Sequence, residues 1–218
     1  MCNTTQKEAG NVIEAQRTHL GVSVQAEPAS KTPTYNLRGN PQWLSDSVSK
    51  KLGLELPTTP NQVAANKQAR LMWLSPDEWL LEAFEAEAAD VEGLLSNRGS
   101  LVSVGHGLVK LQISGDQALH LLAAGTSLDL AQELTPGRCL QTRLAQVSVI
   151  ITAEPADPAE LAELAEPDAD GHANQTPTIT LWVRRSMAHY LWRWFEASLD
   201  RLEPGASGSG SASASASA

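Results

Sequence analysis

Cysteine and long apolar runs are both scarce in this 218-residue sequence. Its two cysteines, Cys2 and Cys139, are too few for a disulfide framework or a metal site of four cysteines. No run approaches the roughly 20 apolar residues of a membrane-spanning helix, and the first residues contain no apolar signal core. We therefore expect a cytoplasmic protein. With no disulfide or metal site to join, Cys139 is expected to be a small, buried apolar side chain.

Positive charge is also limited, since 16 Lys and Arg stand against 25 Asp and Glu and the formal net charge is −9. The basic residues are scattered, whereas binding to phosphates requires a clustered basic surface. This argues against nucleic acid and against an anionic membrane surface as partners. The sequence contains no G-x-G-x-x-G, Walker loop, H-E-x-x-H or C-x-x-C pattern, so no nucleotide, zinc or redox motif can be named.

The centre of the chain has the clearest local pattern. From Leu108 to Ile113 apolar and polar residues alternate, and this period of two predicts a half-buried strand. Ser114 and Gln117 have the spacing of a capping box, so we expect a short helix to begin one or two residues after Ser114. Gly125 follows the apolar face of that helix, where a left-handed C-terminal cap is expected.

Further runs of apolar or alternating residues predict strands, some of them joined in hairpins. They are residues 71–74, 79–83, 101–104, 138–144, 147–152 and 178–183. Ser75-Pro-Asp-Glu78 is a turn sequence, and we interpret Asp77 and Glu78 as turn and cap residues rather than a catalytic carboxylate pair. Gly105-His-Gly107 either forms the bend of a hairpin between residues 101–104 and 108–113 or brings backbone close to a ligand.

Helices are expected in two stretches of the first half. Residues 40–56 have scattered apolar positions and predict a helical turn or two, and residues 85–97 predict an amphipathic helix. With the strands, these elements predict an α+β domain whose mostly antiparallel sheet has helices packed on one face.

Composition further divides the chain. Residues 1–35 are polar and lack a persistent period, so we expect a poorly ordered arm, followed by one domain over residues 36–203. Residues 154–177 contain four prolines and many acids and are interpreted as an inserted acidic loop. His172 makes a metal site there conceivable, but rigid ligand geometry needs support that this composition lacks. Residues 204–218 predict a flexible Gly/Ser/Ala tail.

The last predicted helix runs from Met187 to about Leu202, with Ser186 as its N-cap. Its apolar residues cover an arc of roughly 200°, wider than the stripe of a little over 100° that one sheet contact requires. Either the N-terminal part of the same chain, for example residues 35–56, or a partner subunit covers the surplus. Because Trp, Tyr and Arg are enriched at contact hot spots, the candidate interface residues are Tyr190, Trp192, Arg193 and Trp194.

Several segments resemble a known family. Residues 102–122, from Val102 through Ser114-Gly-Asp to Leu-Leu122, are similar to a segment of the folate-dependent aminomethyltransferase superfamily. Together with blocks at residues 74–81, 125–130, 136–142 and 181–194 they resemble the gamma-subunit family of heterotetrameric sarcosine oxidases. The resemblance extends over most of the chain from about residue 57 to residue 202.

This resemblance implies an aminomethyltransferase-like fold and a supporting role in an oxidoreductase that oxidatively demethylates sarcosine to glycine. In that family FAD, FMN, NAD and tetrahydrofolate belong to the alpha and beta subunits, and zinc belongs to the delta subunit. The gamma chain is expected to bind no cofactor or metal, to supply no catalytic residue and to pack chiefly against alpha. The alternative is a free-standing folate-binding aminomethyltransferase-like protein, although complete aminomethyltransferases are considerably longer.

Overall fold

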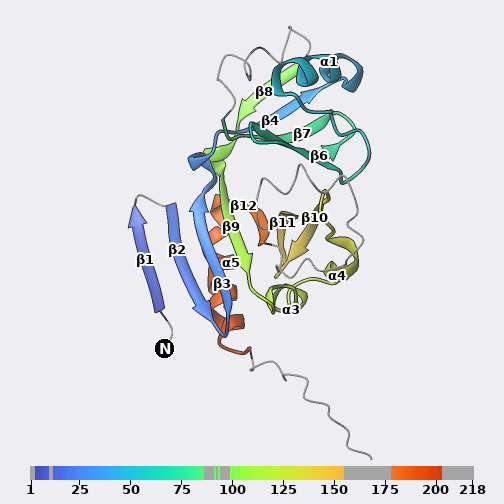
Figure 1. Cartoon of the computed structure of the whole chain (residues 1–218). Helices are drawn as coiled ribbons and strands as arrows, with labels where there is room; N and C mark the ends of the chain where they lie inside the picture. The colour runs from blue at the N-terminus through green and yellow to red at the C-terminus, as the bar shows by residue number, and fades with distance from the viewer. Residues whose placement is uncertain are drawn as a thin grey trace, which may run out of the picture.

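The computed structural model describes residues 3–9, 12–85, 91, 93, 99–154 and 178–202. It is an α+β structure with two antiparallel sheets and few helices (Figure 1). The predicted fold class is therefore confirmed. Apart from a few positions, the predicted helix at residues 85–97, the acidic loop at 154–177 and the tail at 204–218 lie outside the described residues.

The larger sheet has seven strands in the order β1-β2-β3-β9-β12-β11-β10, and every neighbouring pair is antiparallel. Its strands are β1 (Asn3–Ala9), β2 (Val12–His19), β3 (Val22–Pro28), β9 (Leu108–Ser114), β12 (Thr178–Arg184), β11 (Val147–Glu154) and β10 (Cys139–Leu144). The predicted hairpin of residues 138–144 and 147–152 is the pair β10–β11. Its two-residue turn has positive φ at both Ala145 and Gln146.

The smaller sheet has five strands in the order β5-β6-β7-β4-β8, again all antiparallel. They are β5 (Val63–Ala65), β6 (Ala69–Ser75), β7 (Glu78–Ala83), β4 (Thr34–Gly39) and β8 (Gly99–Ser103). The turn predicted at Ser75-Pro-Asp-Glu78 joins β6 to β7, which confirms this hairpin.

The predicted strands all form, but the expectation that they share one sheet is wrong. The chain crosses between the sheets at two short 3-10 turns, η1 (Ala29–Lys31) after β3 and η2 (Gly105–Gly107) before β9. A hairpin bend at Gly105-His-Gly107 is therefore also wrong, because β8 and β9 belong to different sheets. Gly105 suits the close packing of the two turns, since a Cβ there would lie 3.1 Å from Ser30 Cα.

The sheets face each other, and each has a helix on its outer face (Figure 1). Helix α1 (Pro41–Leu52) packs its buried Leu44, Val48 and Leu52 on the smaller sheet. Helix α5 (Arg185–Leu199) packs on β2, β3, β9 and β12 of the larger sheet. The result is four layers, in which the period of two along each strand sends alternate side chains to the helix and to the opposite sheet.

The N-terminal segment differs from its prediction. Instead of a poorly ordered arm, residues from Val12 onward form β2 and β3, and β3 pairs with β9 inside the larger sheet. Val22 and Val24 are fully buried there. The alternation of Val22, Val24 and Ala26 is a strand pattern that the polar composition of the whole segment obscured.

Helix boundaries also differ. Helix α1 is longer than the predicted turn or two, because Asn40 caps its start through a hydrogen bond to Gln42 N and Gly53 ends it in the left-handed region. Helix α3 (Ala118–Ala123) begins later than predicted, because Ser114 still belongs to β9. At φ +109°, Gly115 approaches the β2–β3 turn so closely that a Cβ would lie 2.2 Å from Gly21 O. Helix α5 begins at Arg185, so Ser186 is not its N-cap.

Candidate functional site

Helix α5 supplies the predicted interface residues, and the structure separates them. Trp192 has an exposed fraction of 1%, whereas that of Tyr190 is 49%. Arg193 is exposed and Trp194 is half-buried. The indole of Trp192 donates from Nε1 to Glu196 Oε1 at 3.1 Å, so its polar atom is satisfied beside the core. Trp192 is therefore a core residue of this chain.

The N-terminal strands cover the Trp192 side of α5. Helix α5 contacts β2 and β3, and Arg17 of β2 pairs with Asp200 and with Glu196 at the end of the helix. The Trp192 side of α5 is thus covered by the N-terminal part of the same chain, which was one of the two predicted alternatives. It consists of residues in β2 and β3 rather than of residues 35–56, which lie in the smaller sheet and in α1.

The other margin of α5 remains open. Met187 and Tyr190 are among the exposed large apolar residues, with exposed fractions of 38% and 49%. Residues three apart on a helix are neighbours, so Met187, Tyr190 and Arg193 form a row, which we call the α5 strip. Arg193 lies at its end and donates from Nη1 to Glu196 Oε2 at 3.1 Å.

Trp194 lies one turn after Tyr190 on the same side of α5 and is half-buried. It meets Phe195 edge to face, with ring centroids 5.1 Å apart. It also packs against Gly125, where a Cβ would lie 2.8 Å from the indole. Gly125 was predicted as a left-handed cap, but α3 ends at Ala124 with right-handed geometry. The glycine is needed for its small size, a reason that the sequence of α3 alone could not reveal.

A buried charge network joins the inner faces of the two sheets. Glu82 of β7 has no exposed surface and lies 3.1 Å from Arg70 Nη1. From the larger sheet, Trp182 Nε1 donates to Glu82 Oε1 at 3.2 Å, and Lys110 Nζ lies 3.7 Å from the same oxygen. Lys110 also reaches Glu27 at 3.4 Å. We call these five residues the Glu82 network.

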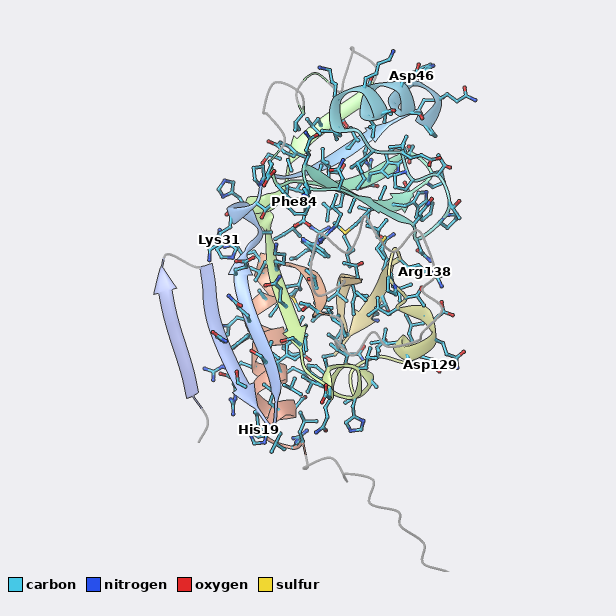
Figure 2. All side chains as sticks on the ribbon, in the orientation of Figure 1. His19, Lys31, Asp46, Phe84, Asp129 and Arg138 are labelled. Carbon is cyan, nitrogen blue, oxygen red and sulfur yellow. The ribbon has the colours of Figure 1, made fainter. Side chains whose placement is uncertain are left out.

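The cation of Arg70 makes further contacts in this network. Its guanidinium lies 5.3 Å from the ring centroid of Phe84, which Figure 2 labels at the junction of the sheets, and 5.9 Å from that of Trp182. Sequence reasoning missed the network. The available signal was Glu82 itself, a carboxylate inside the apolar strand run of residues 79–83.

The contacts of three other potentially reactive side chains, Cys139, Glu78 and Asp77, indicate structural roles. Cys139 is fully buried, and burial raises the pKa of its thiol to about 11, so the nucleophilic thiolate is scarce at neutral pH. Glu78 accepts hydrogen bonds from Asn36 and Arg38, while Asp77 accepts one from Ser75 in the turn. This agrees with the interpretation of Asp77 and Glu78 as turn residues.

Two further kinds of feature are absent from the described part of the chain. No group of three or more His, Cys, Asp and Glu side chains within it is placed to hold a metal ion. None of its helices is long and apolar enough to cross a membrane. The conceivable metal site around His172 falls outside the described residues.

The fold is similar to that of chains in solved structures. A chain of the heterotetrameric sarcosine oxidase from Corynebacterium sp. U-96, in complex with pyrrole 2-carboxylate, is similar with a TM-score of 0.64 and 20% identity, over 88% of this chain and 86% of that one. Aminomethyltransferase T of the glycine cleavage system from Bartonella henselae is similar with a TM-score of 0.48 and 16% identity, over 77% of this chain and 44% of that one. None of the curated proteins matches the sequence.

The sequence family is more specific than the fold. The model of the sarcosine oxidase gamma subunit family matches residues 39–165, more than half of the chain. The chain therefore belongs to the sarcosine oxidase gamma subunit family, as the resemblance of its sequence blocks predicted.

Proposed function

We propose that the chain is the non-catalytic gamma subunit of a heterotetrameric sarcosine oxidase, a cytoplasmic assembly that oxidatively demethylates sarcosine to glycine. The observation that carries this proposal is the family match over residues 39–165. The similarity of the fold to a chain of such an assembly, over 88% of this chain, agrees with it.

In this proposal the chemistry belongs to the partner subunits. FAD, FMN, NAD and tetrahydrofolate are held by alpha and beta, zinc is held by delta, and this chain supports the assembly. The roles of its polar groups are in line with this assignment. Glu82, the most deeply buried acid described, is engaged by Arg70, Lys110 and Trp182, and burial raises the pKa of the Cys139 thiol.

The contact with alpha is assigned to the α5 strip, with Tyr190 at its centre and Met187 and Arg193 beside it. Exposed aromatic and apolar residues in a row fit the composition of a contact hot spot. Trp192 and Trp194 act within this chain, because they pack α5 against the core of the larger sheet.

Co-expression tests the proposal. The chain is expressed with the alpha, beta and delta subunits, and sarcosine-dependent oxygen uptake is compared with that of the same set lacking this chain. We expect all four chains to co-purify in fixed stoichiometry and the incomplete set to assemble poorly. Equal recovery and activity without this chain would overturn the role in assembly.

Titration of the isolated chain with tetrahydrofolate tests the alternative. A gamma subunit whose cofactors lie on its partners should give no saturable heat of binding in calorimetry. Tight binding at one molecule per chain would favour a free-standing folate-binding aminomethyltransferase-like protein and would count against the proposal.

A further inference from the structure

A cleft of about 520 Å³ opens between the inner faces of the two sheets. Leu80 of the smaller sheet and Trp182 of the larger sheet are buried at its base, and Ile150 lies beside them. The cleft faces away from α5, because α5 packs on the outer face of the larger sheet. Its occupant would therefore bind at a surface distinct from the α5 strip.

The mouth of the cleft is positively charged. Arg143 of β10 and Arg184 of β12 are both exposed and line it, whereas its lining contains no Asp or Glu. Arg143 is the cross-strand partner of Ser148, which also lines the cleft. Two arginines without an acid are notable in a chain whose net charge is −9, because guanidinium groups are suited to hold carboxylates.

The two guanidinium groups have unused hydrogen-bonding capacity. Arg143 donates from Nη2 to the backbone oxygen of Gln146 at 3.0 Å, which occupies one of its five donors. Among the residues that the structure describes, the side chain of Arg184 has no hydrogen bond or ion pair. A carboxylate at the mouth would meet donors that do not first have to break another contact.

Apolar surface continues from the cleft onto the edge of the smaller sheet. Asn36 lines the cleft, and its cross-strand partner on β8 is Val102. Cross-strand partners lie on the same face, so Val102 extends this face outward, with an exposed fraction of 53%. A small molecule would fill the cleft and leave Val102 in water, whereas an extended polypeptide would cover both.

We propose that the inter-sheet cleft receives an extended segment of a partner subunit. An acidic side chain of that segment pairs with Arg143 and Arg184, and apolar side chains pack against the partly buried Leu74 and Ile150 of the lining and against Val102. The inference rests on the proposed function, because it assigns a second contact surface to a chain that works within an assembly.

Charge reversal tests this in the complete complex. Arg143→Glu and Arg184→Glu, singly and together, are introduced into the co-expressed assembly, and the affinity of the chain for the remaining subunits is measured. We expect the double variant to bind at least about tenfold more weakly, since truncating close charge pairs mainly raises the dissociation rate. The matched control for each single variant is Lys50→Glu at an exposed position of α1, which packs on the outer face of the smaller sheet, because it makes the same change in net charge as one Arg→Glu substitution.

Thermal unfolding of each variant separates binding from folding, because both arginines are exposed and the melting temperature should be unchanged. Equal weakening by Lys50→Glu and by the single variants Arg143→Glu and Arg184→Glu would mean that net charge alone acts, and the inference would be overturned. Unchanged affinity of the double variant would overturn it as well.

A cysteine probe reports occupancy directly. Ser148→Cys is made together with Cys2→Ser, and Cys139 stays unreactive because it is buried. On assembly the new thiol should react with a thiol reagent at least about tenfold more slowly, whereas a Lys50→Cys thiol should not change. If the subunits assemble and the Ser148→Cys thiol remains reactive, the cleft inference fails and the proposed function stands. If no assembly forms, the proposed function fails and the inference fails with it.

Discussion

Replacing Glu82 with Gln should strongly destabilise this chain. The substitution keeps the shape of the side chain but removes the charge that faces Arg70 and Lys110, whose side chains are only 9% and 11% exposed. Lys110 retains Glu27 as a partner, so the main consequence is a buried Arg70 without its carboxylate. Removing one member of a buried pair costs about 3–5 kcal/mol.

The assay is urea and thermal unfolding of the isolated chain, followed by tryptophan fluorescence and circular dichroism. For a chain of this size 1 kcal/mol corresponds to roughly 2–4 °C, so the melting temperature should fall by about 10 °C. Arg38→Ala serves as the control, because it breaks the exposed pair with Glu78 in the same sheet and should have little effect.

A compensating variant locates the cause. Arg70→Met combined with Glu82→Gln removes both charges of the pair together with their desolvation penalty, while the amide oxygen can still accept from Trp182 Nε1, and replacing a buried pair by uncharged groups is often neutral or stabilising. We expect this double variant to recover most of the stability that Glu82→Gln loses. A loss below about 1 kcal/mol for Glu82→Gln would refute the view that the network holds the sheets together.

Four other variants test separate parts of the structure. Trp192→Ala removes core packing and should lower the free energy of unfolding by about 3 kcal/mol or more while changing assembly little. Tyr190→Ala should weaken assembly by about 2 kcal/mol and leave the free energy of unfolding unchanged. Measuring unfolding and binding for both variants tests the assignment, and the reverse pattern would contradict it. Gln146→Gly should stabilise the β10–β11 hairpin by about 0.5–1 kcal/mol, because Gln146 has φ 70°, and an unchanged urea midpoint would count against this. Burial raises the pKa of the Cys139 thiol from 9.0 to about 11, so its contribution to stability is complete below pH 9 and is lost between pH 9 and 11, where the thiol of the unfolded chain ionises first. Cys139→Ala should therefore show a smaller fall in melting temperature over that range. Identical profiles would mean that the thiol has the same pKa in the folded and the unfolded chain.

Local patterns allowed most strands to be predicted. The alternation in β9, β11 and β12 and the turn between β6 and β7 depend on neighbouring residues, and these elements form as expected. The division into two sheets could not be predicted in this way. The alternation of residues along a strand indicates which side chains share a face, but it does not indicate which sheet the strand joins. In addition, the sequence of the crossover at Gly105-His-Gly107 resembles that of a hairpin bend.

The site was predictable to the same degree. On a helical wheel Tyr190 and Trp192 lie at the two margins of the apolar arc of α5, and the arc is wider than one sheet contact needs. The surplus was therefore visible in the sequence. Which margin is covered depends on where β2 and β3 dock, and this is a long-range contact between segments more than 150 residues apart. Trp192 became the buried margin and Tyr190 the open one.

The two crossovers between the sheets have a consequence for the order of folding. Strands β3 and β9 are hydrogen-bonded neighbours, yet the whole smaller sheet lies between them in the sequence. The smaller sheet is thus a nested unit that leaves the larger sheet at η1 and returns at η2, where the two turns contact each other.

If the nested unit folds first, it brings the ends of β3 and β9 together and replaces a long flexible loop by a short effective one, which lowers the entropy of closing their contact. We expect the amides of β6 and β7 to become protected from hydrogen exchange before those of β3 during refolding, and simultaneous protection would contradict this order. During synthesis, β3 would then remain unpaired with β9 until the smaller sheet has folded and has brought the two strands together.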